Sequence, residues 1–356
     1  MLLLLVTAQA AELEATPHVQ VRPRVEASTG KDGAEGGETA VVSQRARLGA
    51  TMTRDALSVH ATVQDVRAWG SESDTLGDFH ADALDMHEAW FAWTGDSATL
   101  KLGRQEIALH EHRLVGNVDW TQQGRAFDGA LLSLNDGPVS ADLGAAVLSQ
   151  AAWFESATVF LRAGPALDGA AVDVVSVLDW TDGADLRSTS GLYAKGASGI
   201  VRGRVEGYAQ VQGDTFGWMA GAAGTVAPEV ATRPSVTLWY DHLSGDFATL
   251  YATNHKFYGL ADIAWFTTGN HVDGQGLQDA ALKLAAVPVA EVKAKLDAHV
   301  FLYSEPLADA VLGQEVDLWF TRGLTDGLAL ATGGSVFLRA SADPDLWGWL
   351  QLDAKL

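Results

Sequence analysis

The 356-residue sequence predicts an all-β protein, a transmembrane antiparallel up-and-down β-barrel of about 18 strands. Polar and apolar residues alternate along most of the chain, which is the pattern of strands with one wet face and one apolar face. Strand-like segments of about ten residues follow one another to the last residue, with almost no helical periodicity. Short turns alternate with longer polar loops between them, as in a barrel whose two rims face different compartments.

The alternation itself is persistent but does not identify the solvent. In residues 17–27, Arg22 and Arg24 alternate with Val21 and Val25, and the same period recurs in 41–52, 57–64, 201–211, 292–300 and 314–321. A soluble β-sandwich alternates in the same way, with its apolar face inward. The membrane interpretation therefore depends on the strand count and the connections.

The strand count follows from a parity argument. Long loops are expected at about 28–39, 70–83, 107–124, 244–274 and 304–312, and all of them should lie on one rim. Two loops lie on the same rim only if an even number of strands separates them, so the strands between loops 107–124 and 244–274 must be even in number. An even total places both termini on the periplasmic side. The predicted strands are 17–27, 41–53, 56–68, 84–94, 98–106, 125–134, 138–149, 155–163, 171–180, 187–196, 200–212, 215–227, 233–243, 275–287, 291–303, 313–323, 327–339 and 345–356.

The first ten residues, MLLLLVTAQA, predict a secretory signal peptide with Ala8-Gln9-Ala10 as its small-residue cleavage site. A positively charged n-region is missing, and a short apolar tail on a soluble protein is the alternative. Residues 11–356 are expected to form a single barrel domain. No apolar run of about 18 residues follows residue 10, so a membrane protein of this sequence must be a closed barrel.

Composition excludes some functions. The formal charge of −21 argues against nonspecific nucleic-acid binding, which needs clustered lysine and arginine. The absence of cysteine is compatible with a secreted protein but does not identify one. Several tryptophans fall near predicted strand ends, where interfacial girdles would place them, with ordinary core packing as the alternative: Trp69, Trp90, Trp93, Trp180, Trp239, Trp265, Trp319, Trp347 and Trp349.

No catalytic motif is present, so we expect neither an enzyme nor a cofactor. His110-Glu111-His112 would place two imidazoles on one side of a strand and is a candidate metal site. A solvated cluster in a loop or in the lumen is the favoured interpretation, since no third ligand is placed by the sequence. We therefore predict no metal.

Cationic side chains on the wet faces predict a pore that attracts anions. A barrel of this size encloses more room than its own side chains fill, and cationic groups inside a low-dielectric wall concentrate anions. The guanidinium fork matches a carboxylate, which suits carboxylated sugars. Bracing of the wall by ion pairs is the alternative role. The lumen-facing candidates are Arg22, Arg24, Arg45, Arg47, Arg104, Arg202, Arg204, Lys293 and Lys295, with Arg113 and Arg125 in a loop at the mouth.

Two sequence segments carry a resemblance to a known family. Gly103-Arg104-Gln105-Glu106, Arg113-Leu114-Val115-Gly116, Trp120 and Arg125-Ala126-Phe127-Asp128-Gly129 resemble the signature of the alginate-export family of outer-membrane β-barrels, and 255–262, HKFYGLAD, is similar to that family's HKFYGYAD segment. The resemblance implies a Gram-negative outer-membrane location, export of the polyanion alginate, and a charged constriction containing Arg104, Glu106, Arg125 and Asp128. It also singles out His255, Lys256 and Asp262 as a loop motif.

The predicted function is passive conduction of an anionic polysaccharide such as alginate across the outer membrane. A general porin for small solutes is the alternative within the same fold, and a soluble or surface β-protein is the alternative outside it. The expected partners are the cargo, outer-membrane lipid, and periplasmic export or assembly proteins.

Overall fold

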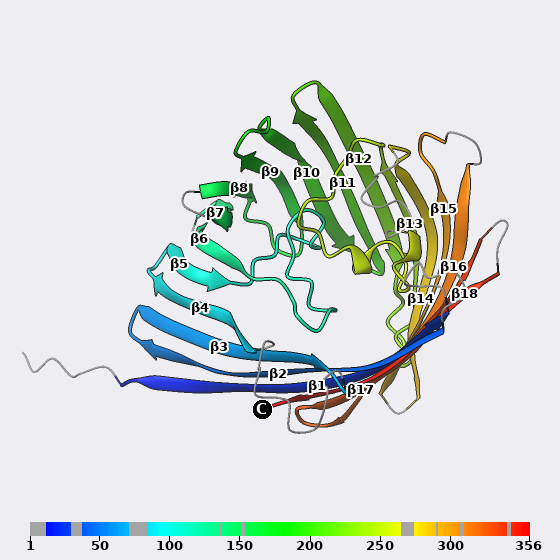
Figure 1. The fold of residues 1–356 in the computed structure, drawn as a ribbon, viewed down its shortest axis with the longest axis horizontal. Coiled ribbons are helices and arrows are strands. Elements are labelled where there is room, and N and C mark those ends of the chain that lie inside the picture. Colours follow the sequence, from blue (N-terminus) through cyan, green and yellow to red (C-terminus); the bar gives the residue numbers. More distant parts are fainter. Residues whose placement is uncertain are drawn as a thin grey trace, which may run out of the picture.

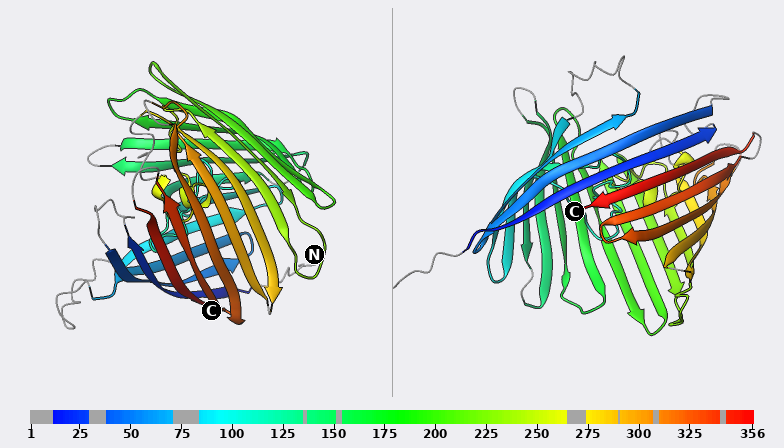
Figure 2. Two further views of the ribbon diagram at one scale, coloured as in Figure 1. Left: turned by 90° about the vertical axis from the view of Figure 1, so that its right-hand side faces the viewer. Right: turned by 90° about the horizontal axis from the view of Figure 1, so that it is seen from below.

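A computed structural model describes residues 12–29, 38–70, 84–134, 137–150, 154–264, 274–289, 291–306, 310–339 and 343–356. Eighteen strands form one antiparallel sheet, and the sheet closes because β1 pairs with both β2 and β18 (Figure 1). Side views show the strands running obliquely around the wall (Figure 2). The predicted fold class is confirmed. The proposed signal peptide and Trp265 lie outside the described residues.

Every predicted strand is present, and the largest errors are three residues, at the starts of the first two strands, predicted at residues 17 and 41 and found at Glu14 and Glu38. The strands are β1 Glu14–Thr29, β2 Glu38–Arg54, β3 Leu57–Ala68, β4 Leu84–Thr94, β5 Ala98–Gln105, β6 Phe127–Leu134, β7 Val139–Gln150, β8 Phe154–Pro165, β9 Ala171–Thr181, β10 Arg187–Ser198, β11 Val201–Gln212, β12 Thr215–Val226, β13 Ser235–Leu243, β14 Leu277–Val289, β15 Val292–Leu302, β16 Val311–Thr325, β17 Leu328–Leu338 and β18 Asp345–Lys355. A short 3-10 helix, η1, spans Asn254–Lys256.

The five predicted long loops follow β1, β3, β5, β13 and β15, all odd-numbered strands, so they share one rim as the parity argument requires. We call this the long-loop rim and the opposite one the short-turn rim. The alternation of lengths is less strict than predicted. The connection between β11 and β12 is a two-residue turn on the long-loop rim, and an eight-residue connection, 227–234, lies on the short-turn rim.

The aliphatic face of the sheet points outward. Leu48, Val205 and Leu238 are 61%, 56% and 68% exposed, and no second sheet covers them in the described part of the chain. An exposed aliphatic band around a closed barrel is the surface that contacts lipid. No helix among the described residues is both long and apolar enough to cross a membrane.

The tryptophans divide between the two faces, which corrects the girdle prediction. Trp69, Trp93 and Trp180 are outward and 57%, 51% and 40% exposed, as predicted. The remaining five described members of the predicted set lie inside the barrel, because each shares its strand face with polar lumen residues: Trp90, Trp239, Trp319, Trp347 and Trp349. Trp218, which was not predicted, is outward and 40% exposed.

Two loops from the long-loop rim fold into the interior (Figure 1). The first inner loop, residues 106–126, connects β5 and β6, and the second inner loop, described for residues 244–264, follows β13. Buried apolar residues of both loops, including Leu114, Val115, Phe257 and Tyr258, form one cluster with wall residues that face the lumen. The hydrophobic core of this barrel therefore lies inside it, between the loops and the wall.

Candidate functional site

Three lumen arginines on β1 and β2 hold the first inner loop against the wall. Arg22 donates to the main-chain oxygens of Asp119 at 2.8 Å and Thr121 at 2.7 Å, and Arg45 Nη2 lies 2.8 Å from the Asp119 carboxylate. Arg24 lies over the Trp120 ring, 3.9 Å from its centroid. These three arginines are almost fully buried. They face the lumen as predicted, and each contacts the first inner loop, so bracing is the role their contacts support.

Glu106 begins the first inner loop and connects it to β2 and to one further strand, β4. Its carboxylate accepts hydrogen bonds from His87 Nε2 at 2.7 Å and Asn117 Nδ2 at 2.7 Å and lies 3.2 Å from Arg47 Nη1. Burial alone would raise the pKa of Glu106, but these hydrogen bonds and the Arg47 charge outweigh it and lower the pKa to about 2. Glu106 is therefore ionised throughout the physiological range.

Arg113 is the most deeply buried charge of the first inner loop. It donates to Glu206 of β11 at 3.0 Å, to Asp241 of β13 at 2.5 Å and to the Tyr258 hydroxyl at 2.9 Å. Its guanidinium carbon lies 3.6 Å from the centroid of the Phe257 ring. Burial alone would lower the pKa of Arg113, but Asp241, Tyr258 and Glu206 together raise it well above its usual value. One side chain thus joins the two loops to the wall.

The two inner loops are also joined through their main chains. Gly116 N donates to Tyr251 O at 2.8 Å, Tyr251 N to Leu114 O at 2.9 Å, and Thr253 N to His112 O at 3.0 Å. Arg125 donates to Tyr251 O and to Gly116 O, so it closes this junction. Burial lowers the pKa of Arg125. The loops form a single plug, and Arg125 supports it from within.

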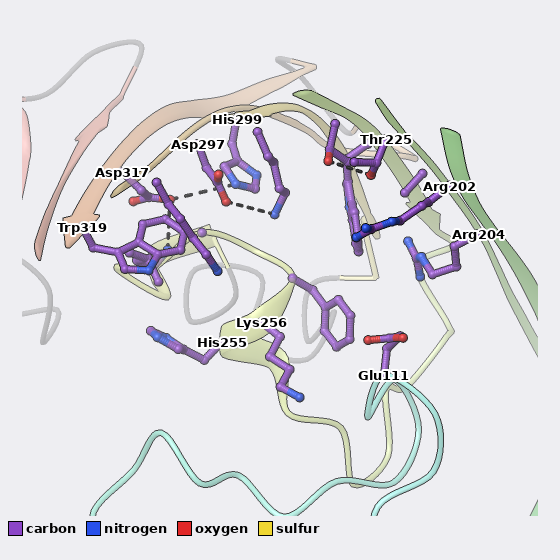
Figure 3. Close-up of a pocket in the computed structure, with 18 of the residues that line it drawn as sticks. Glu111, Arg202, Arg204, Thr225, His255, Lys256, Asp297, His299, Asp317 and Trp319 are labelled. Atoms are coloured by element: carbon purple, nitrogen blue, oxygen red, sulfur yellow. Dashed lines mark hydrogen bonds and ion pairs between the residues drawn. The ribbon is translucent and has the colours of Figure 1, made fainter. Parts of the chain in front are cut away.

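Between the plug and the wall lies a cavity of about 860 Å³ (Figure 3). Cationic side chains reach it from both sides: Arg202 from β11, Lys295 from β15 and Lys256 from the second inner loop. None of these three makes an ion pair with a described residue. Lys295 lies 4.9 Å from the centroid of Trp319, and Arg204, another cation at the cavity, lies 4.0 Å from that of Trp239.

The carboxylates at the same cavity already have partners. Asp297 pairs with Lys283 at 3.4 Å, and Glu111 lies 3.5 Å from Lys195. Asp317 accepts hydrogen bonds from Ser335 Oγ at 2.5 Å and from a main-chain N–H of the second inner loop. Unlike Arg202, Arg204 forms ion pairs with Glu206 and Asp241. Three cations at the cavity lack an ion-pair partner among the described residues, against one carboxylate, Asp317, whose two donors are neutral, so the excess charge there is positive despite the net negative charge of the chain.

Arg104 and Asp128 are placed differently from the prediction. Arg104 pairs in register with Ala89 and so shares the outer face with Leu102 and Phe91. Its Nη1 lies 2.8 Å from Asp128 Oδ2, and the Asp128 side chain is 61% exposed. The prediction that both residues belong to a lumen constriction is wrong, because the alternation of β5 puts Arg104 on the face of Leu100 and Leu102. Glu106 and Arg125 do lie in the lumen.

Of the other predicted cations, Lys293 lies on β15 two residues from Lys295 and on the same lumen face, nearer the short-turn rim. Within the loop motif, His255 and Asp262 contact each other. His255 Nδ1 lies 2.9 Å from Asp262, and its ring stacks on Trp120 with centroids 4.3 Å apart. Lys256 extends toward the cavity, and burial lowers its pKa. A cationic role in the lumen therefore stays a prediction for Lys293 and Lys295 and for the loop's Lys256.

The two histidines of 110–112 point to different partners. His110 lies 3.3 Å from Asp173 and stacks on Tyr193, whereas His112 lies 3.3 Å from Thr253 Oγ1. Among the described residues, no three His, Asp or Glu side chains lie close enough together to hold a metal ion. The sequence reasoning missed Tyr251 and Tyr258 as anchors of the plug, because single tyrosines in a long loop carry no periodicity.

A closed barrel with an aliphatic exterior, a charged interior and a cavity along its wall defines an outer-membrane channel. The alginate export family model matches residues 17–150, which confirms the predicted resemblance over that part of the chain. The match ends before 255–262, so the resemblance of that segment stays a prediction. No curated protein matches the chain.

Solved structures confirm the fold. The outer-membrane protein OpdK from Pseudomonas aeruginosa is 10% identical, with a TM-score of 0.69 over 96% of this chain and 98% of that one. OccAB4 from Acinetobacter baumannii is 12% identical, with a TM-score of 0.71 over 98% of this chain and 99% of that one. The fold and the matched family are those of outer-membrane channels, and the protein is placed in the outer membrane.

Proposed function

We propose that the protein is a passive, anion-favouring channel whose cargo consists of carboxylated saccharides and other small organic acids. The observation that carries this proposal is the set of three cations without ion-pair partners, Arg202, Lys256 and Lys295, around one cavity. Cations held in a low-dielectric wall raise the local concentration of anions. The cavity volume of about 860 Å³ is within the range of sites for small molecules.

Conduction of the alginate polymer is the second candidate. The family match over residues 17–150 favours it, and the arginine-rich lumen of β1 and β2 lies within that match. The plug favours the smaller cargo, because buried ion pairs fix it to strands on several sides of the wall. One solved neighbour, OpdK, was crystallised with vanillate, a small carboxylate. In either case we infer that the long-loop rim faces outward and that both termini lie on the periplasmic side.

The test is conduction by purified protein in planar bilayers under a KCl gradient. The proposal predicts a reversal potential displaced toward that of chloride, and a current that uronate monomers and dimers block. Block by alginate polymer at lower concentration than by its monomers would favour the second candidate. Cation selectivity would exclude both anion-channel proposals.

A further inference from the structure

The tip of the second inner loop is held by two carboxylates of the barrel wall. Ala261 N donates to Glu315 Oε1 at 2.8 Å, and Leu260 N donates to Asp317 Oδ2 at 3.3 Å. Both carboxylates belong to β16, and they are 0% and 1% exposed. Two consecutive main-chain N–H groups of the loop therefore donate to two buried carboxyl groups of one strand. The loop is thus attached to the wall through its backbone.

The contact also explains the glycine in the loop. Gly259 has φ +82°, a conformation that side chains rarely adopt, and a Cβ placed there would lie 2.5 Å from the Glu315 carboxyl group. Asp317 has further contacts on the wall: its carboxyl group accepts a hydrogen bond from the Ser335 hydroxyl and lies 3.9 Å from His299 Nε2. Asp317 therefore also has partners on the wall, outside the loop.

The same loop supplies one side of the cavity. Lys256 and Phe257 line it, and they lie three residues or fewer before Gly259. Lys256 has no ion-pair partner among the described residues that would hold it there. Its placement therefore depends on where the backbone of the loop is anchored, at the Arg113 contacts with Tyr258 on one side and at β16 on the other.

We propose that Glu315 and Asp317 are positioning residues that set the anion preference of the channel by holding Lys256 at the cavity. This inference rests on the proposed function. It predicts a change that loss of the Glu315 carboxyl group cannot produce through charge alone. Removing an acidic group does not by its charge make the lumen less favourable to anions, whereas releasing the loop should withdraw Lys256 and reduce the preference for anions.

The decisive comparison is between Glu315→Ala and Glu315→Gln, each measured as a chloride-to-potassium permeability ratio. The amide oxygen of glutamine still accepts the Ala261 N–H, so Glu315→Gln should keep at least the wild-type ratio. Glu315→Ala should lower the ratio by about the factor that Lys256→Ala produces. The double variant Lys256→Ala/Glu315→Ala should lower it no further. A higher ratio in Glu315→Ala, or equal changes in both Glu315 variants, would overturn the proposal.

A second measurement does not depend on conduction. The chain has no cysteine, so Leu260→Cys provides one thiol for a water-soluble maleimide. Labelling should be slow in the otherwise wild-type barrel and faster when Glu315→Ala is added. An unchanged labelling rate would contradict the positioning role of Glu315 even if the wild-type channel is anion-selective. If the wild type shows no anion preference but labelling accelerates, the proposed function fails and the loop attachment stands.

A loop-side variant covers the case in which Glu315→Ala does not fold, as judged by loss of the heat-dependent gel shift of barrels. Gly259→Ala disrupts the same contact and should lower the permeability ratio and speed labelling. Gly224→Ala is the matched control, because a Cβ there meets nothing within 4 Å and no positive φ is required. Equal behaviour of the two glycine variants would contradict the proposal.

Discussion

Replacing Arg113 by alanine should loosen the plug without unfolding the barrel. Arg113 is 2% exposed and its carboxylate partners Glu206 and Asp241 are both buried. Removing one member of a buried ion-pair network costs about 3–5 kcal/mol, because the remaining charges are left uncompensated. Arg204 still contacts both carboxylates, so we expect about 3 kcal/mol. At about 1.4 kcal/mol per factor of ten, the undocked plug becomes about 100-fold more populated.

Single-channel recording is the assay. Arg113→Ala should give higher mean conductance with frequent transitions between levels, whereas the heat-dependent gel shift should persist because the wall keeps all its strand pairings. Arg233→Ala is the matched control, since Arg233 pairs with Glu291 at 2.7 Å but both side chains are more than half exposed. Exposed pairs contribute little. Currents as quiet as those of the wild type in Arg113→Ala would refute the view that this residue secures the plug.

Three further predictions test separate parts of the structure. Arg104→Leu should leave the chloride-to-potassium permeability ratio unchanged, because the Arg104 side chain is on the outer face. A changed ratio would indicate that Arg104 faces the lumen instead. Glu106 has a lowered pKa, so its tether should be complete above its ordinary value of 4.5 and weaken as pH falls toward about 2. Current noise should rise only in that acidic window, and noise rising above pH 6 would contradict the tether. Gly144→Ala should lower the melting temperature by overpacking at about 1–3 kcal/mol, since a Cβ would lie 2.0 Å from the Phe160 ring; an unchanged gel-shift temperature would argue against this contact.

The wall of this protein was predictable from sequence because most of its strands keep a two-residue period, with register shifts in a few pairs such as β3–β4 and β7–β8. The same alternation decides whether a side chain points into the barrel or outward. Trp319 shares its face with Glu315 and Asp317 and therefore lies inside the barrel. Arg104 shares its face with Leu102 and therefore points outward. Both errors came from weighing residue type or family motif above parity. The interior loops were not predictable, because Arg113, Tyr251 and their partners are separated by up to 145 residues and obey no period.

The same period explains why residue type alone does not assign a role to a lumen arginine. Arg22 and Arg202 both lie on inward faces, yet Arg22 is 3% exposed and binds loop carbonyls, whereas Arg202 is exposed and has no ion-pair partner among the described residues. The difference is set by the plug, which binds Arg22 directly, whereas Arg202 borders the cavity between the plug and the wall. Cations beneath the plug are desolvated and must be paired, and only those beside it remain free to meet an anion. Under the proposed function, the plug therefore divides the lumen arginines between two roles, bracing where the plug binds them and attraction of anions where they border the cavity.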